Sequence, residues 1–333
     1  MSDFQSIGVV GAGAFGTALA IATARAGRAV VLWARNPDLA AALEKDRENA
    51  VYLPGPKLAP DIAVTADLAR VAACDVLLLV VPAQTLRPLC ERLAPLVAAG
   101  TPLVSCAKGI EQESDCLMTE VLAAELPGNP AAVLSGPTFA IEVARGLPSA
   151  VTLAASDEAL GRELVVSLGS RSFRPYLSMD PVGAQVGGAV KNVLAIACGI
   201  VTGRALGDNA RAALITRGLA EIGRLGLAKG GRRETLMGLS GLGDLTLTCG
   251  AMQSRNYSLG VALGEGRGLT EILAERRSVA EGVYSAAAVN HLARKLELDM
   301  PITAAVDDVL NRGADIEDSI GGLLARPFKY ELS

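Results

Sequence analysis

The sequence has few aromatic residues and a single histidine. Only 3% of its 333 residues are aromatic, although half are hydrophobic. The core must therefore be built from alanine, leucine, valine, isoleucine and glycine, whose small side chains let helices lie close to a sheet. The one histidine, His291, falls inside a predicted helix, where a packed or surface role is expected. Because histidine is the commonest general acid or base, a lysine becomes the natural proton donor of any acid–base site.

Cysteine pairs and a basic charge balance are also missing. Six cysteines occur without a CxxC pair or zinc-like clustering, which predicts reduced thiols and no metal site. The formal net charge of −4 argues against a nucleic-acid partner.

Long hydrophobic runs and a targeting segment are absent as well. The most apolar stretch, Val193–Val201, is shorter than the roughly 20 residues that span a bilayer, so the chain is predicted not to span a membrane. Met1 leads almost directly into the first predicted strand, which favours a cytoplasmic location.

The first half alternates short apolar runs with helical patterns. Buried strands are expected at Ile7–Val10, Ala29–Trp33, Val76–Val81, Leu103–Cys106, Ala131–Leu134 and Ala150–Leu153, with helices at Phe15–Ala26, Pro37–Asn49 and Thr85–Ala98 between them. Runs that are apolar throughout suit strands buried on both faces of a parallel sheet. This alternation predicts a doubly wound α/β domain.

The second half has a different texture. Helices are expected at Val182–Arg204, Asn209–Lys229, Ser258–Gly264, Leu269–Glu275, Ser285–Leu296 and Thr303–Arg312, and no convincing strand separates them. The sequence therefore predicts an α/β domain over residues 1–180 and an all-α domain over residues 181–333. Because the helical domain is this apolar, we expect it to bury one face in a homodimer.

A glycine-rich turn follows the first predicted strand. Gly11, Gly13 and Gly16 form a GxGxxG pattern between a strand and a helix, which is the context of a dinucleotide-binding turn. Gly11 permits the turn, Gly13 lets the backbone approach a pyrophosphate, and Gly16 allows close helix–strand packing. The sequence therefore predicts a nicotinamide dinucleotide cofactor.

The residue after the second strand bears on which dinucleotide is bound. An acidic residue usually ends this strand and binds the ribose hydroxyls, but here Ala34-Arg35-Asn36 follows Trp33. Arg35 is able to pair with a 2′-phosphate, which modestly favours NADP(H) over NAD(H). Stacking of Arg35 on adenine, compatible with either cofactor, stays open.

Further polar blocks lie in loops after predicted strands or near helix starts. Lys191 is set in the apolar, glycine-rich segment Gly187–Asn192, where burial or a neighbouring cation would lower its pKa. A solvated lysine is the competing interpretation. Asp244 follows a glycine-rich turn, so it is a candidate either for catalysis or for capping a helix.

Six blocks in order make the chain resemble a bacterial NAD(P)-dependent glycerol-3-phosphate dehydrogenase over nearly its whole length. They are Gly11–Gly16, Lys108-Gly109, Ser135–Ala140, Gly187–Asn192, Gly241–Leu245 and Gln253–Asn256. The resemblance implies a Rossmann domain followed by a helical domain, an architecture like that of 6-phosphogluconate dehydrogenase. It also implies interconversion of dihydroxyacetone phosphate and sn-glycerol 3-phosphate, which supplies glycerophospholipid synthesis.

The resemblance further implies roles for single residues. Lys191 would be the catalytic acid/base, Lys108 would polarise the carbonyl or lower the pKa of Lys191, and Asp244 would orient both lysine and substrate. The substrate-binding positions would be Lys108, Gly136, Thr138, Lys191, Asp244, Ser254, Arg255 and Asn256, with Arg255 holding the phosphate. The cofactor-binding positions would be Gly11, Gly13, Ala14, Phe15, Gly16, Arg35, Lys108, Ala140, Arg255, Val279 and Glu281.

The sequence departs from the family in one of these places. Ala14-Phe15 stands where a serine–aromatic pair is common, so one hydroxyl contact to the cofactor is expected to be missing. The alternatives are a related reductase, such as a 2-ketopantoate reductase or a 3-hydroxy acid dehydrogenase, and a non-catalytic NADP(H) sensor. Retention of Lys191 and Asp244 weighs against the sensor.

Overall fold

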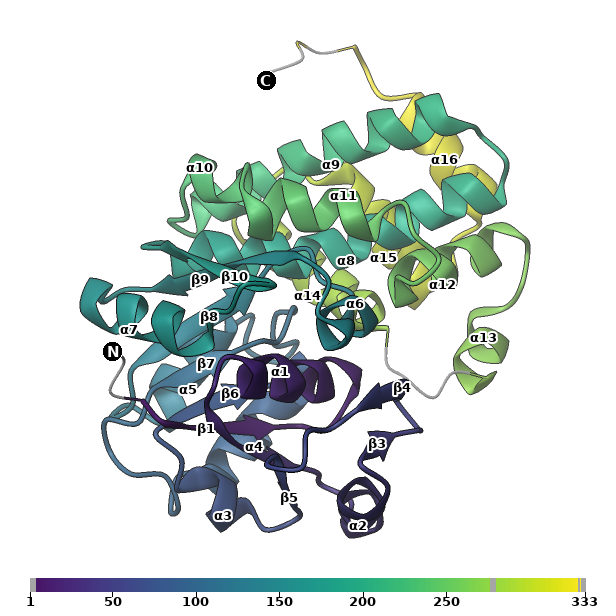
Figure 1. Ribbon diagram of the computed structural model, residues 1–333. Helices are drawn as coiled ribbons and strands as arrows, with labels where there is room; N and C mark the ends of the chain where they lie inside the picture. Colours follow the sequence, from purple (N-terminus) through teal and green to yellow (C-terminus); the bar gives the residue numbers. More distant parts are fainter. Residues whose placement is uncertain (1–3, 276–279, 329, 331–333) are drawn as a thin grey trace.

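The computed structural model describes residues 4–275, 280–328 and 330. One sheet of eight strands lies in the first half of the chain, and packed helices make up the second half (Figure 1). Among the described residues, the last strand ends at Ser178 and the first long helix begins at Pro181, so the change from sheet to helices falls between these two residues.

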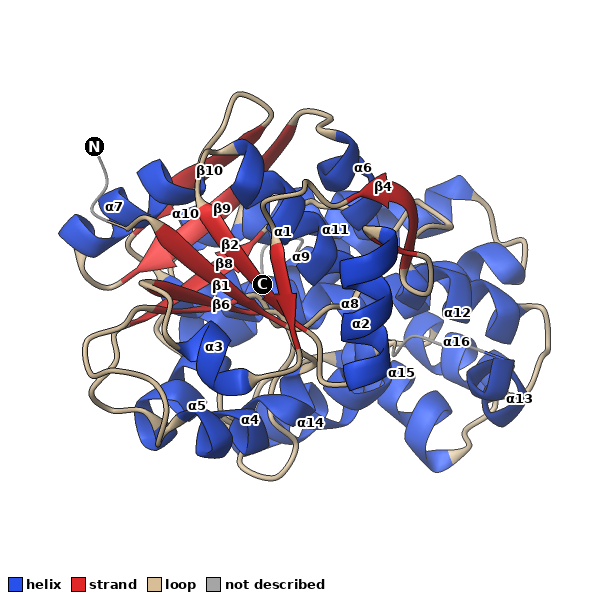
Figure 2. Ribbon diagram, turned by 60° about the horizontal axis from the view of Figure 1, so that its bottom comes forward, coloured by secondary structure: helices blue, strands red, loops and turns tan. Residues whose placement is uncertain are grey.

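Strands and helices alternate through the first half. The strands are β1 Ser6–Val10, β2 Ala29–Trp33, β3 Glu48–Asn49, β4 Leu53–Lys57, β5 Ala63–Thr65, β6 Val76–Leu79, β7 Leu103–Ser105, β8 Ala131–Ser135, β9 Ser149–Ala155 and β10 Phe173–Ser178. The helices are α1 Ala14–Arg25, α2 Pro37–Asp46, α3 Leu68–Ala72, the 3₁₀ helix η1 Ala83–Thr85, α4 Leu86–Leu93, α5 Met118–Glu125, α6 Ala140–Arg145 and α7 Glu158–Leu168. Helices cover both faces of the sheet (Figure 2).

The strand order explains where a ligand binds. From one edge the sheet reads β10-β9-β8-β7-β6-β1-β2-β5. The six strands from β5 to β8 are parallel, in the 3-2-1-4-5-6 arrangement of dinucleotide-binding folds. Successive connections diverge between β1 and β6, which makes the carboxyl ends of these two strands the point where such a sheet holds its ligand.

The expectation of a parallel sheet is wrong for the strand predicted at Ala150–Leu153. That strand, β9, runs antiparallel to β8, and β10 runs parallel to β9. The connection between β8 and β9 contains only the six-residue helix α6, which rises about 9 Å. A helix this short does not carry the chain back to the end of the sheet where β8 begins. The next strand, β9, therefore starts near the end of β8 and runs antiparallel to it.

Several elements lack the pattern that would have predicted them. The strand β4 has the sequence LPGPK, and β10 contains Pro175 at an edge of the sheet, where proline costs no ladder hydrogen bond. The helix predicted over Pro37–Asn49 ends early, because Arg47 adopts a left-handed conformation and Glu48–Asn49 pairs with β4.

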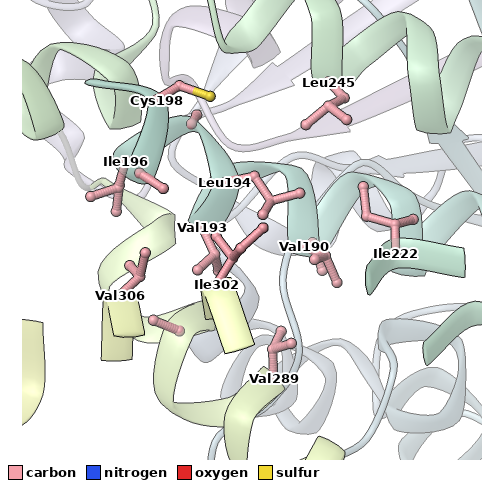
Figure 3. Close-up of a cluster of buried hydrophobic side chains, with 14 of the residues drawn as sticks. Val190, Val193, Leu194, Ile196, Cys198, Ile222, Leu245, Val289, Ile302 and Val306 are labelled. Carbon is pink, nitrogen blue, oxygen red and sulfur yellow. The ribbon is translucent and has the colours of Figure 1, made fainter. Parts of the chain in front are cut away.

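In the described part of the second half, all of the regular elements are helices. They are α8 Pro181–Gly203, α9 Asp208–Ala228, α10 Arg233–Leu236, the π-helix η2 Leu239–Gly243, α11 Asp244–Thr248, α12 Arg255–Gly264, α13 Leu269–Glu275, α14 Glu281–Lys295, α15 Pro301–Arg312 and α16 Ile316–Leu324. The core forms where Val190, Val193 and Leu194 of α8 meet side chains of α9, α11, α14 and α15 (Figure 3).

The central helix α8 has the length and hydropathy of a membrane span, although the apolar stretch within it appeared too short. Its most apolar window has a mean hydropathy of 1.5, but 89% of that window is buried inside the fold. This burial makes α8 the core helix of its domain.

Glycine pairs bring α8 and α12 into backbone contact. A Cβ at Gly199 would lie 2.2 Å from the Tyr257 carbonyl oxygen, and one at Gly203 would lie 2.9 Å from the Cα of Gly264. Any side chain at these positions would force the helices apart. The close packing fixes the start of α12 beside α8, where the candidate site lies.

We expect Gly199→Ala to lower the free energy of unfolding by about 1–3 kcal/mol, because the added methyl group overlaps the Tyr257 carbonyl. Urea unfolding measures the effect. Gly223→Ala on α9 is the matched control: its Cβ meets no atom within 4 Å, and the gain in helix propensity is up to about 1 kcal/mol. Wild-type stability in Gly199→Ala would contradict the close packing.

Candidate active site

The site lies where the carboxyl ends of the parallel strands meet the helical domain. The loops after β1, β6, β7 and β8 carry the glycine-rich turn, Pro82–Gln84, Lys108-Gly109 and Gly136–Thr138, respectively. Across from them stand α8, α11 and the start of α14. Hydrogen bonds from Lys108 to Asp244 and from Asn192 to the Lys108 carbonyl join the two halves here.

The glycine-rich turn has the geometry of a dinucleotide cradle. Gly11 has a φ of +122°, and a Cβ there would lie 2.3 Å from the Val80 carbonyl oxygen. A Cβ at Gly16 would lie 1.7 Å from the Gly11 carbonyl oxygen, so the start of α1 packs directly on the turn. At Gly13 a Cβ would meet nothing within 4 Å. This open space in front of the α1 N-terminus fits a pyrophosphate, which helix amides bind.

The side chain of Asn49 fixes this turn through hydrogen bonds. Its buried amide nitrogen donates to the Ala12 carbonyl at 2.9 Å and to Thr17 Oγ1 at 2.7 Å. Its amide oxygen accepts from the Tyr52 backbone. The short strand β3 therefore fixes the cradle through a side chain that the sequence pattern did not single out.

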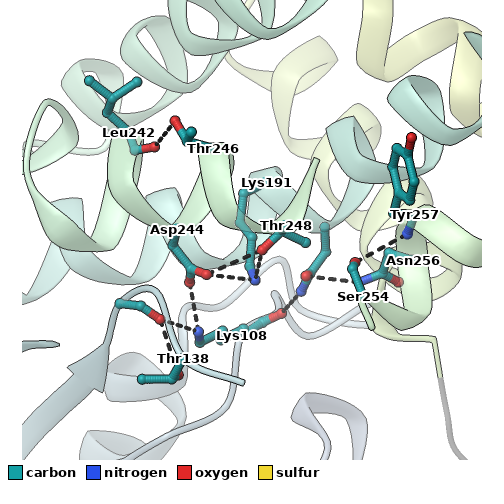
Figure 4. A network of polar contacts seen from close by, with 12 residues as sticks. Lys108, Thr138, Lys191, Leu242, Asp244, Thr246, Thr248, Ser254, Asn256 and Tyr257 are labelled. Atoms are coloured by element: carbon teal, nitrogen blue, oxygen red, sulfur yellow. Dashed lines mark hydrogen bonds and ion pairs between the residues drawn. The ribbon is translucent and has the colours of Figure 1, made fainter. Parts of the chain in front are cut away.

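A carboxylate between two lysines forms the centre of the site (Figure 4). Asp244 Oδ1 accepts from Lys191 Nζ at 2.9 Å, and Asp244 Oδ2 accepts from Lys108 Nζ at 2.6 Å. Lys191 also donates to Thr248 Oγ1 at 2.8 Å. Asp244 is 1% exposed and Lys191 6% exposed. The alternatives of a solvated lysine and a helix-capping aspartate therefore do not describe these two residues.

Burial and neighbouring charge set the protonation of this group. Burial lowers the pKa of Lys191 to about 8, the Lys108 ammonium acts in the same direction, and Asp244 opposes both. Burial acts to raise the pKa of Asp244, but the two ammonium groups outweigh it and hold this pKa below its usual value. The result is a buried lysine that titrates near physiological pH beside a carboxylate that stays ionised.

The loop after β8 contributes a second contact to Lys108. The Gly136 carbonyl accepts from Lys108 Nζ at 2.9 Å and from Thr138 Oγ1 at 3.2 Å. Thr138 thus makes a local turn contact, and the turn lies within the polar cluster. Gly136 itself has a φ of +150° and packs against Val151 of β9.

The segment Ser254–Asn256 lies at the start of α12. Ser254 Oγ caps the helix by accepting from the Tyr257 backbone at 3.2 Å. The Asn256 amide donates to Asn192 Oδ1 at 2.8 Å and accepts from the Gly282 backbone at 3.0 Å. Both side chains therefore take part in structural hydrogen bonds in this structure. The guanidinium of Arg255 is close enough to Glu281 to act on its pKa.

Comparison with known proteins assigns this arrangement to a family. Residues 6–161 match the model of the NAD-dependent glycerol-3-phosphate dehydrogenase N-terminus, and residues 180–321 match that of its C-terminus. The chain belongs to the NAD-dependent glycerol-3-phosphate dehydrogenase family.

Relatives of known name agree with the family model. Glycerol-3-phosphate dehydrogenase [NAD(P)+] of Parvibaculum lavamentivorans is 57% identical, over 98% of both chains. The enzyme of that name from Rhodospirillum rubrum is 58% identical, over 98% of this chain and 93% of its own length. A solved glycerol-3-phosphate dehydrogenase from Coxiella burnetii is 41% identical, covers 97% of this chain and 99% of its own, and superposes with a TM-score of 0.93.

The alternative dehydrogenases share the fold only. A ketopantoate reductase from Ralstonia eutropha superposes with a TM-score of 0.61 at 15% identity, over 92% of this chain and 97% of its own. The glycerol-3-phosphate dehydrogenase family therefore shares the doubly wound domain and the helical domain with these enzymes. The family models and the sequence identities, rather than the fold, carry the distinction.

The positions expected to contact the cofactor are spread along this edge of the sheet. Ala14 and Phe15 begin α1, Ala140 begins α6, and Arg35 is exposed just beyond β2. Glu281 begins α14 and accepts from the Ala83 backbone at 3.0 Å. Burial raises the pKa of the Glu281 carboxyl, while the Ala83 amide and the charge of Arg255 act in the opposite direction. Val279 lies outside the described residues.

Besides Asn49, three residues of the site escaped the sequence argument. Thr248 lies four residues after Asp244, a spacing that places two side chains on one face of a helix, so it offered a signal. Asn192 donates to the Lys108 carbonyl at 2.9 Å, and Gln84 donates to the Ile110 carbonyl at 2.8 Å. Neither contact has a local sequence signature, because each joins segments far apart in the chain.

Gly13→Ala separates cofactor binding from folding. The methyl group meets no protein atom within 4 Å, so the melting temperature should not fall, but it occupies the space proposed for the pyrophosphate. Losing one hydrogen bond to a charged group costs about 1.5–3 kcal/mol, so we expect Kd for NADH and NADPH to rise about 10-fold or more. Fluorescence titration measures Kd, with Gly223→Ala as the control. Wild-type affinity in Gly13→Ala would show that the cofactor does not approach this turn.

Proposed function

We propose that the protein catalyses the reversible reduction of dihydroxyacetone phosphate to sn-glycerol 3-phosphate, using NADH or NADPH. The product would supply glycerophospholipid synthesis. The observation that supports the proposal is the buried Lys191–Asp244–Lys108 group next to a dinucleotide cradle. Oxidation of NADPH and NADH in the presence of dihydroxyacetone phosphate, followed by the absorbance of the reduced nicotinamide, tests it.

Each member of the polar group has a distinct task in this mechanism. When bound, the reduced nicotinamide supplies the hydride that reaches C2 of the substrate. The Lys191 ammonium gives a proton to the C2 oxygen, and in the reverse direction the neutral amine accepts it. Lys108 polarises the same carbonyl, and Asp244 holds both lysines in place through the hydrogen bonds described above. A proton donor with a pKa close to the working pH is the most effective.

The substrate phosphate is assigned to the start of α12. A guanidinium suits a phosphate because its planar fork donates two hydrogen bonds. Arg255 is the first residue of α12, and the amides of a helix N-terminus add positive potential there. Since the Ser254 and Asn256 side chains make structural hydrogen bonds, we propose that they shape this end of the helix and that Arg255 holds the phosphate.

The choice between the two cofactors is assigned to Arg35. The residue is exposed at the end of β2, the position that faces the adenosine ribose in this fold. Pairing with a 2′-phosphate there would favour NADP(H) modestly. The ratio of kcat/KM for NADPH and NADH measures this preference.

The proposal extends to domain roles, location and assembly. Residues 1–180 would hold the cofactor and residues 181–333 the substrate, in a cytoplasmic enzyme. A homodimer is supported by α16, which has no buried residue, and by Leu324 and Phe328, which are 81% and fully exposed, respectively. Exposed apolar side chains at the end of α16 and in the residues beyond it favour a contact surface there.

We expect Lys191→Met to lower kcat for dihydroxyacetone phosphate reduction by roughly 10²–10⁴-fold, the usual contribution of a general acid. Cofactor affinity should stay close to that of the wild type, because Lys191 lies in the helical domain. Steady-state kinetics and cofactor titration provide the two readouts. Lys45→Met on the exposed end of α2 is the control. A near-normal kcat in Lys191→Met would rule out the assigned acid.

Arg255→Ala should lower kcat/KM for dihydroxyacetone phosphate by about 10- to 100-fold, since a hydrogen bond to a charged group contributes about 1.5–3 kcal/mol. The same variant should leave kcat/KM for unphosphorylated dihydroxyacetone unchanged, so the ratio of the two isolates the phosphate. Arg255→Lys should recover part of the loss. If both substrates lose activity equally, Arg255 acts on the cofactor or the fold instead.

Leu324→Asp and Phe328→Asp should convert a dimer to a monomer, because each places a charge on the exposed apolar surface of α16 and the residues beyond it. Light scattering after size-exclusion chromatography measures the mass. Val166→Asp, at an exposed position of α7 in the other domain, is the control. A wild-type protein that elutes as a monomer would contradict the proposed assembly.

A further inference from the structure

Gln84 makes two hydrogen bonds to the backbone of the loop that carries Lys108. Its amide nitrogen donates to the Ile110 carbonyl at 2.8 Å, and its amide oxygen accepts from the Gln112 N–H at 3.0 Å. One side chain thus satisfies a donor and an acceptor two residues apart, as a neighbouring strand would. Gln84 is half-buried in η1, the short helix that follows the loop after β6.

The segment around Gln84 is itself held by the helical domain. The neighbouring Ala83 N–H donates to Glu281 at the start of α14. On the other side, a Cβ at Gly109 would lie 2.6 Å from the Ala83 Cβ, so η1 and the Lys108 loop are in van der Waals contact. η1 therefore lies between α14 and the Lys108 loop and contacts both.

We propose that Gln84 is a positioning residue, which holds the backbone of the Lys108 loop so that the Lys108 ammonium stays beside Asp244 and Lys191. The inference rests on the proposed roles of the two lysines. A lysine side chain is long and flexible, so the place of its ammonium depends on where its Cα is fixed. Asn192 holds the Lys108 carbonyl from one side, and Gln84 holds the loop two residues further along.

Gln84 is the more selective of these two contacts to test. Asn192 also binds Asn256 at the start of α12, so its replacement would disturb the phosphate site as well. The two hydrogen bonds recorded for the Gln84 side chain both go to the Lys108 loop. A change at Gln84 therefore acts first on the backbone of this loop, at Ile110 and Gln112.

The protonation of Lys191 reports the position of Lys108. The titratable groups that act on or near Lys191 are Lys108, Asp244, Cys249 and, at the start of α14, Glu281. Lys108 lowers the pKa of Lys191 by repulsion and also shares Asp244 with it. If the Lys108 ammonium moves away, repulsion weakens and Asp244 interacts with Lys191 alone. Both changes raise the pKa of Lys191.

This dependence gives a readout that a loss of folded protein would not change. In the direction of ketone reduction Lys191 must be protonated, so kcat/KM falls as pH rises through its pKa, which is about 8 in this structure. In Gln84→Met we expect this alkaline limb to move to higher pH. A variant that is merely less stable has less active enzyme, but its limb stays where it was.

The experiment compares full-length Gln84→Met with Gln112→Met in kinetics from neutral to alkaline pH. The Gln112 side chain is exposed, and its amide donates to the Tyr284 carbonyl on α14, so the control removes a glutamine amide from the same loop. We expect Gln84→Met to lose about 10- to 100-fold in kcat through misplacement of Lys108. Gln112→Met should match the wild type.

Lys108→Met separates failure of this inference from failure of the proposed function. If Lys108→Met lowers kcat and moves the limb but Gln84→Met does neither, Gln84 does not position Lys108. If Lys108→Met itself leaves both unchanged, the proposed role of Lys108 is wrong. In the double variant, Gln84→Met should add nothing to the effect of Lys108→Met, because residues that act through one group are not additive. Additive losses would overturn the inference.

Discussion

The carboxylate of Asp244 between two ammonium groups is the constraint on which the rest of the structure depends. Transferring charges from water into a protein interior costs several kcal/mol each unless they are paired and hydrogen-bonded. Asp244 and Lys191 belong to the helical domain, and Lys108 comes from a loop of the sheet domain. The group is therefore complete only when the domains are docked as observed, so the chemistry and the domain arrangement depend on the same contacts.

Backbone packing makes that docking possible. Two glycines of α8, one turn before Lys191, lie against the opposite segments. A Cβ at Gly187 would lie 2.6 Å from the Ser240 carbonyl, and one at Gly188 would lie 2.9 Å from Ser135 Oγ. Larger residues would push α8 away from both η2 and the end of β8. The same helix packs on α12 through Gly199 and Gly203. The glycine content of α8 thus explains how Lys191 reaches Asp244 while staying buried.

The sequence predicted the features that depend on local pattern. The glycine-rich turn, the alternation of strands and helices and the apolar setting of Lys191 all show in short stretches, and the structure has the turn and the burial that these stretches indicated. The direction of β9 was not predictable in this way, because an apolar run looks the same in either orientation and only the short α6 connection decides it. Similarly, the hydrogen bonds of Gln84, Asn49 and Asn192 join residues distant in sequence, and no periodicity reveals them.

The balance at Lys191 explains how the proposed acid–base chemistry would proceed without a histidine; the one histidine, His291, pairs with Asp115 instead. An exposed lysine has a pKa near 10.4 and gives up its proton reluctantly at neutral pH. A lysine buried without a counter-charge would lose its proton altogether and have none to give. Burial and Lys108 push the pKa of Lys191 down, while Asp244 pulls it up, and the two tendencies meet at about 8. The Asp244 carboxylate therefore keeps the buried Lys191 protonated, and Lys108 keeps the pKa of Lys191 low enough for the proton to be released.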